Sequence, residues 1–64
     1  MAINRELNML DNEASSLEGI GGHHLSTGDA AQGVVYLNEA LEIYRRLGMR
    51  RDIERVRARL ASVG

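Results

Sequence analysis

Two glycine-centred stops divide this sequence into three helical segments. The first is Thr27-Gly28-Asp29, in which Gly28 suits the position after a helix end and Asp29 suits the N-cap of the next helix. The second stop is Leu47-Gly48. We therefore expect one helical segment that ends near residue 27, a helix over about 30–47 and a third over about 50–62.

The segment before the first stop is long for one helix. Asp11 or Asn12 could cap a helix that begins at Glu13, with residues 3–9 as a separate short helical turn. One continuous helix is the alternative, since no residue there forbids it. We expect a break near Leu10–Asp11.

Apolar residues recur at helical spacing in all three segments, which predicts an all-α fold. The third segment carries one stripe, formed by Met49, Ile53, Val56, Leu60 and Val63. The second has two apolar faces, as expected of a helix that lies between two neighbours. These faces comprise Gly33, Leu37, Ala40, Leu41 and Tyr44 on one side and Tyr36, Ile43 and Leu47 on the other. The first segment aligns Ala14, Leu17, Ile20, Gly21, His24 and Leu25.

Gly21 and Gly33 fall on the inward faces of the first and second helices. A glycine inside a helix costs about 1 kcal/mol relative to alanine. Two such glycines at facing positions predict a close approach of the two helices.

The chain has few other means of stabilising itself. With 64 residues it buries only a modest share of its surface, and without cysteine it can form neither disulfides nor thiolate metal sites. Helix packing or self-association must supply the stability. The apolar runs are too short to span a membrane, and the N-terminus has no basic segment followed by an apolar one, so we expect a cytoplasmic protein.

Charge is distributed unevenly along the chain. Residues 1–44 hold seven acids and one base, a net charge of −6, whereas residues 45–64 hold seven arginines and two acids, a net charge of +5. Every basic residue is arginine, which suits interfaces better than lysine does. A GC-rich genome would explain the lack of lysine, but it does not explain the clustering.

One spaced set of residues resembles the tetratricopeptide repeat, a helix–turn–helix unit of roughly 34 residues. The set comprises Leu17, Ile20-Gly21, His24, Gly28-Asp29, Gly33, Leu37 and Ala40-Leu41. The terminal proline of that family is missing, and Arg45 stands in its place. The local sequence around Glu13-Ala14 and around Arg57-Ala58 also resembles the C-terminal repeats of large bacterial transcriptional regulators, which are common in actinobacteria.

The resemblance implies a single domain with the organisation of a helical solenoid fragment. Residues 1–10 would be the tail of a preceding unit, 13–47 one helix–turn–helix repeat, and 50–63 the first helix of a next unit or a cap. It also implies a partner groove, lined by Ser15, Glu18, Gly22, Leu25 and Ser26. Helix packing would rest on Leu17, Ile20, Gly21, His24, Gly33, Leu37, Ala40 and Leu41. The family's clamp for C-terminal carboxylates is not matched, so we do not expect chaperone-tail binding.

Two motifs suggest chemistry on first inspection. His23-His24 could hold a metal, but adjacent helical residues point about 100° apart, and zinc ligands on a helix are three or four residues apart. The simpler interpretation is that His24 packs and His23 is exposed. Gly19-Ile20-Gly21-Gly22 lacks the strand and the Lys-Ser/Thr of a phosphate-binding loop. We expect no catalytic site, no metal and no cofactor.

The leading hypothesis is a non-catalytic protein–protein interaction module. About three repeats are usually needed to cover the apolar faces, and this chain has one and a half. We therefore expect the open edges to pair between copies in a homodimer or a higher assembly, with no membrane partner. These edges comprise Ile3, Leu7 and Leu10 at one end and Ile53, Val56 and Leu60 at the other. The alternative is a small nucleic-acid-binding protein that uses the arginine-rich third helix.

Overall fold

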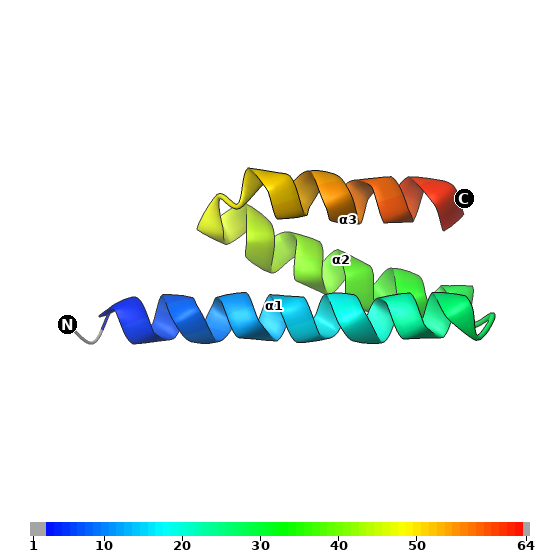
Figure 1. Ribbon diagram of the computed structural model, residues 1–64, viewed down its shortest axis with the longest axis horizontal. Helices are drawn as coiled ribbons and strands as arrows, with labels where there is room; N and C mark the ends of the chain where they lie inside the picture. The colour runs from blue at the N-terminus through cyan, green and yellow to red at the C-terminus, as the bar shows by residue number, and fades with distance from the viewer. Residues whose placement is uncertain (1–2, 64) are drawn as a thin grey trace.

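The computed structural model describes residues 3–63, with side chains from residue 10 onward. It contains helices α1 (Ile3–Ser26), α2 (Ala30–Leu47) and α3 (Arg50–Val63) and no strand within the described residues. α1 and α2 form an antiparallel pair, and α3 returns along the other side of α2 in the direction of α1 (Figure 1). The all-α prediction is confirmed. No helix within residues 3–63 has both the length and the apolarity to span a bilayer.

The predicted break in the first segment is wrong, because α1 runs without interruption through Leu10, Asp11 and Asn12. Aspartate and asparagine lower helix stability by only about 0.7 kcal/mol each, and the stretch contains neither proline nor glycine before Gly19. Breaking the helix there would sacrifice several backbone hydrogen bonds. The alternative of one continuous helix therefore holds.

Local side-chain and backbone chemistry ends the helices where the sequence predicts. The Gln32 amide donates to the Asp29 carboxylate at 3.4 Å, which makes Asp29 the N-cap of α2. Gly28 and Gly48 have φ values of 89° and 70°, a left-handed conformation that favours glycine. The Gly48 amide donates to the carbonyl of Arg45 at 3.2 Å, which closes the end of α2.

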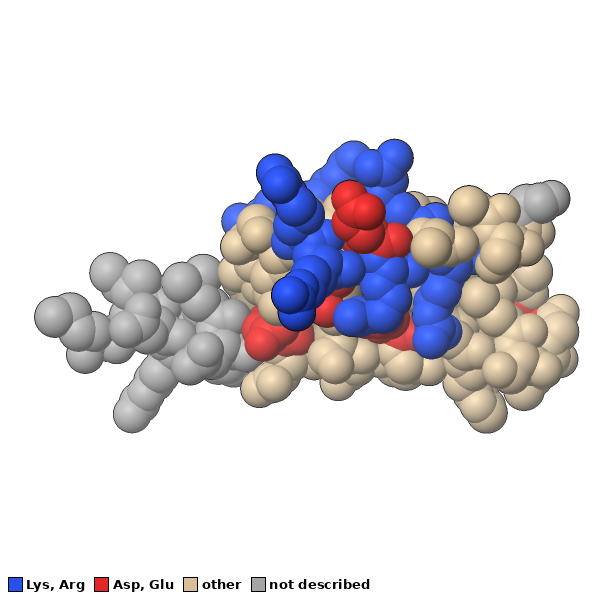
Figure 2. Space-filling model, turned by 45° about the horizontal axis from the view of Figure 1, so that its top comes forward, with Lys and Arg blue, Asp and Glu red and all other residues tan. Residues whose placement is uncertain are grey.

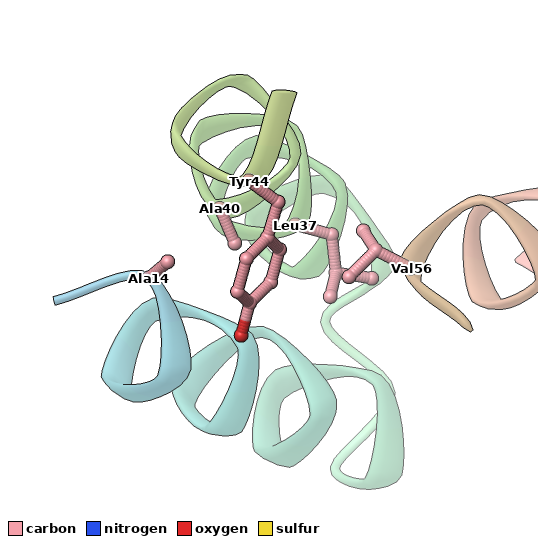
Figure 3. Close-up of a cluster of buried hydrophobic side chains, with 5 residues drawn as sticks. All are labelled: Ala14, Leu37, Ala40, Tyr44 and Val56. Atoms are coloured by element: carbon pink, nitrogen blue, oxygen red, sulfur yellow. The ribbon is translucent and has the colours of Figure 1, made fainter. Parts of the chain in front are cut away.

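The core lies where the three helices converge. Its buried side chains are Ala14 from α1, Leu37, Ala40 and Tyr44 from α2, and Val56 from α3 (Figure 3). Half-buried apolar residues surround them: Leu17, Leu25, Leu41, Ile43, Met49, Ile53 and Leu60. α2 packs against both α1 and α3, as expected of a helix between two neighbours.

Ile20 is the exception among the residues predicted to pack, because its exposed fraction is 43%. Ala14 and Gly21 are seven residues apart, nearly two helical turns, so both point toward α2 and both are buried. Ile20 precedes Gly21 by one residue and therefore points about 100° away from that line. It lies on the side of α1 that no other helix covers.

The close approach predicted at Gly21 and Gly33 is confirmed, and both glycines are buried. A Cβ atom added to Gly33 would lie 2.6 Å from the Cδ2 atom of Leu25 and 3.0 Å from the carbonyl oxygen of Gly21. A Cβ atom added to Gly21 would lie 2.9 Å from the Cγ atom of Leu37. The two glycines thus set the distance between α1 and α2.

This contact predicts different outcomes for two glycine-to-alanine substitutions. Gly19→Ala should raise the free energy of unfolding by about 1 kcal/mol, because Gly19 is exposed in α1 and nothing lies within 4 Å of its Cβ position. Gly33→Ala should leave the protein about 1–3 kcal/mol less stable than Gly19→Ala, since the methyl group must displace Leu25 and the backbone of α1. Urea unfolding followed by circular dichroism measures both. Equal stabilisation by the two substitutions would contradict the close contact.

Candidate functional site

A buried carboxylate, that of Glu18, connects all three helices. Glu18 is 9% exposed, and its Oε1 atom accepts hydrogen bonds from the Tyr44 hydroxyl of α2 at 3.0 Å and from Arg55 Nη2 of α3 at 2.8 Å. Its Oε2 atom accepts a third hydrogen bond from Arg55 Nε at 2.7 Å. Arg55 and Glu18 therefore form a bidentate pair with two hydrogen bonds. Bidentate pairs between ionised groups are stronger than hydrogen bonds between neutral groups.

Each member of this network is positioned by its own helix. Glu18 follows Ala14 by four residues and precedes Gly21 by three, so it shares their inward-facing side of α1. Tyr44 crosses the core from the last turn of α2, and its hydroxyl points toward α1 (Figure 3). Asp52, one turn before Arg55 on α3, contacts Arg55 Nη2 at 2.5 Å and fixes its guanidinium.

The network shifts the titration of its members in opposite directions. The hydrogen bond from Arg55 lowers the pKa of Glu18 below its usual value, against the opposing effect of burial. Burial and the neighbouring Glu18 carboxylate raise the pKa of Tyr44 to about 12. Glu18 is thus held ionised and Tyr44 held neutral. Because both oxygens of Glu18 are occupied by donors, this carboxylate serves to join helices and is not free to accept a proton from a ligand.

Two of the five residues predicted to line a partner groove, Glu18 and Gly22, lie beneath arginine side chains of α3. Glu18 is buried beneath Arg55, and Leu25 is half-buried with its side chain against Gly33. Gly22 lies under Arg59, since a Cβ added there would be 2.6 Å from Arg59 Nη1. Ser15 and Ser26 are exposed. The groove prediction is therefore wrong for Glu18, because Arg55 reaches from α3 to this carboxylate and covers it.

The predicted open edges also need correction. Val56 is fully buried in the chain's own core, and Ile53 and Leu60 are half-buried against it. Val56 is thus enclosed in the chain's own core, whereas Ile53 and Leu60 keep part of their surface exposed. Leu10 is half-buried, and the side chains of Ile3 and Leu7 lie outside those that the structure describes.

The histidine pair lies at the hairpin end and forms a local packing cluster. The ring of His24 stacks on Tyr36 with centroids 5.4 Å apart and an angle of 10° between the ring planes. His24 Nδ1 lies 3.7 Å from an Asp29 carboxylate oxygen, and His23 is exposed. In the part of the chain that the structure describes, no three His, Asp or Glu side chains come together in a group that could hold a metal.

Arginine side chains form a basic surface over α3. Arg50, Arg51, Arg57 and Arg59 are exposed, as is Glu54. Figure 2 shows that basic side chains dominate this face, with acidic side chains among them. Within α3, Arg55 forms an ion pair with Asp52. Most of this basic charge is therefore directed to solvent.

A shallow groove with an acidic rim lies between α1 and α2. Its walls carry three glutamates and one arginine, and its floor is apolar. The lining residues are Glu13 and Leu17 of α1 and Glu39, Glu42, Ile43 and Arg46 of α2, which we call the acidic groove. Because all of them belong to the hairpin, the acidic groove lies on a side of the pair that α3 leaves uncovered.

No protein-family model, curated protein or solved structure matches this chain. α1 and α2 form an antiparallel pair with Gly28-Asp29 at its turn. α1 begins at Ile3, so no helix boundary separates residues 3–10 from the repeat that the resemblance implied for 13–47. Antiparallel helix pairs with short loops occur in many helical proteins, so this geometry alone does not establish the family. Membership of that family stays a prediction.

The Glu18 network predicts a specific loss of stability on truncation of Arg55. Arg55→Ala should lower the free energy of unfolding by about 1–3 kcal/mol, because it leaves a buried carboxylate without its main donor. Arg57→Ala is the matched control, since Arg57 is exposed on the same helix, and it should change stability by less than about 0.5 kcal/mol. Urea unfolding of the two variants tests this, and similar losses would show that the Glu18–Arg55 pair contributes nothing particular.

The lowered pKa of Glu18 predicts a dependence of stability on pH. Its ordinary value is 4.5, and a carboxyl whose folded-state pKa is depressed stabilises the fold above the unfolded value and loses this contribution as the pH falls through the folded value. The stability difference between the native chain and Glu18→Gln should therefore be largest near neutral pH and shrink below about pH 4.5. Denaturant unfolding over a pH series measures it, and a difference that does not vary with pH would exclude Glu18 as the titrating group.

Proposed function

We propose that this chain is a non-catalytic protein–protein interaction module of tetratricopeptide type that associates with copies of itself. The helical stack supports this proposal, because α2 is flanked by α1 and α3 and the arrangement extends in one direction like a fragment of a solenoid. The resemblance to repeats of large bacterial regulators suggests that such a module would serve in a regulator.

The observation that carries the proposal is the uncovered side of the hairpin. Leu17 and Ile43 are only half-buried in the acidic groove. Ile20 follows Leu17 by one turn on α1 and is 43% exposed, and Val35 precedes Glu39 by one turn on α2 and is 51% exposed. These exposed side chains add apolar surface to the hairpin outside the groove lining. Covering such a surface with another protein is favourable by about 25 cal/mol for each Å² of apolar area removed from water.

The charge arrangement favours a protein partner over nucleic acid. Arg55, central in the basic helix, has its charge offset by Glu18 and Asp52. Glu54 lies within the exposed arginine surface. These acids would repel the phosphate groups of a nucleic acid, whereas a protein surface of mixed charge can place basic groups opposite them.

Sedimentation equilibrium tests self-association directly. We expect the average mass of the chain to rise with concentration between about 1 µM and about 1 mM, the range in which modest interfaces assemble. The rise should be smaller at high salt, because screening weakens contacts between oppositely charged surfaces. A folded chain that stays monomeric over the whole range would refute self-association.

A further inference from the structure

We propose that the acidic groove of one copy binds the exposed arginine face of α3 from a second copy, so that copies associate head to tail. This inference rests on the proposed self-association and assigns its two surfaces. It arises from two faces of the same molecule that are complementary in charge, and the charged side chains invoked on them take no part in the hydrogen bonds of the Glu18 network.

The acidic groove supplies a receptor of suitable chemistry. Glu13, Glu39 and Glu42 stand on its rim and are exposed, and Arg46 is the one base among the lining residues. The local net charge is therefore −2 from three acids and one base. The floor of Leu17 and Ile43 can receive the aliphatic stem of an arginine while the guanidinium reaches a rim carboxylate.

The outer face of α3 supplies the matching ligand. Val56 and its apolar neighbours face the chain's own core, so the opposite face of α3 is wholly polar or small. Arg50 and Arg57 are seven residues apart, nearly two helical turns, and therefore project from one side of the helix, about 100° from Val56. Exposed Glu54 lies one turn from each of them, so these three side chains carry a net charge of +1. Ala58 and Ala61 are also exposed, and their small side chains allow a neighbouring molecule to approach the helix closely.

Charge also argues against symmetric pairing through either face. A contact of groove with groove would place Glu13, Glu39 and Glu42 against a second set of the same glutamates. A contact of α3 with α3 would oppose two sets of arginines. The contact of groove with α3 is the one that brings opposite charges together. Such a contact joins different surfaces, so it extends into chains or closes into rings rather than stopping at a dimer.

Reciprocal charge reversal tests the assignment. One variant carries Glu39→Arg and Glu42→Arg, and the other carries Arg50→Glu and Arg57→Glu. All four side chains are exposed, so both variants should fold, which circular dichroism checks. Each variant alone would bring like charges into contact, and we expect its self-association to weaken at least tenfold. An equimolar mixture restores opposite charges at every contact and should recover the mass seen for the native chain.

A control variant and two contrary outcomes distinguish failure of the assigned surfaces from failure of self-association itself. Asn38→Arg adds a positive charge at an exposed site of α2 outside the acidic groove and should leave self-association unchanged. If either double variant alone still associates as the native chain does, self-association stands and the two assigned surfaces are wrong. In that case the acidic groove would be free for a basic segment of a different protein. If the native chain is monomeric at every concentration, the inference fails together with the self-association on which it rests.

Discussion

The Glu18 carboxylate is held on α1 and receives hydrogen bonds from Tyr44 on α2 and from Arg55 on α3. Apolar contacts between helices tolerate sliding and rotation, because they have no preferred direction. A bidentate arginine–carboxylate pair does not tolerate such movements, because both parallel hydrogen bonds are lost when either partner moves. In a chain with so small a core, this network determines how α3 is seated on the hairpin and, through α3, which surfaces stay open.

The orientation of α3 gives the molecule two different sides. On one side, Arg55 and Arg59 of the basic helix cover Glu18 and Gly22, two of the residues that the resemblance assigned to a partner groove, whereas Ser15 and Ser26 stay exposed. On the other side, the hairpin keeps its acidic groove. The uneven charge of the sequence thus becomes a separation in space, and this separation is what the proposed head-to-tail association uses.

Gly21 and Gly33 have a complementary role at the other end of the hairpin. They bring the backbones of α1 and α2 together, so that Leu25 and Leu37 fill the space that a Cβ atom would need. Beyond this point, Tyr44 fills the core and carries its hydroxyl to Glu18. The hairpin therefore combines a close glycine contact with a larger aromatic spacer, and α3 packs against the surface that results.

Much of the fold was accessible from the sequence because its causes are local. Asp29, Gly28 and Gly48 act within one helical turn, so the bounds of α2 and the start of α3 follow from them. The apolar stripes likewise predict which sides of α2 and α3 are buried. The predicted break near Leu10–Asp11 failed because a capping residue only permits a helix start, and the weak preferences of Asp11 and Asn12 do not outweigh a continuous run of backbone hydrogen bonds.

The surfaces, in contrast, were decided by tertiary structure. Glu18 stands among inward-facing residues, and this position between Ala14 and Gly21 is a signal for a buried acid that needs a basic partner. Its partner, however, is 37 residues away on a helix whose arginines look alike in sequence. Only the docking of α3 selects Arg55 from among them and buries Val56, because that choice depends on the angle and height at which two helices meet. The sequence by itself determined the ends of α2, the start of α3 and the buried sides of these two helices, and the tertiary structure determined which charged faces remain available to a partner.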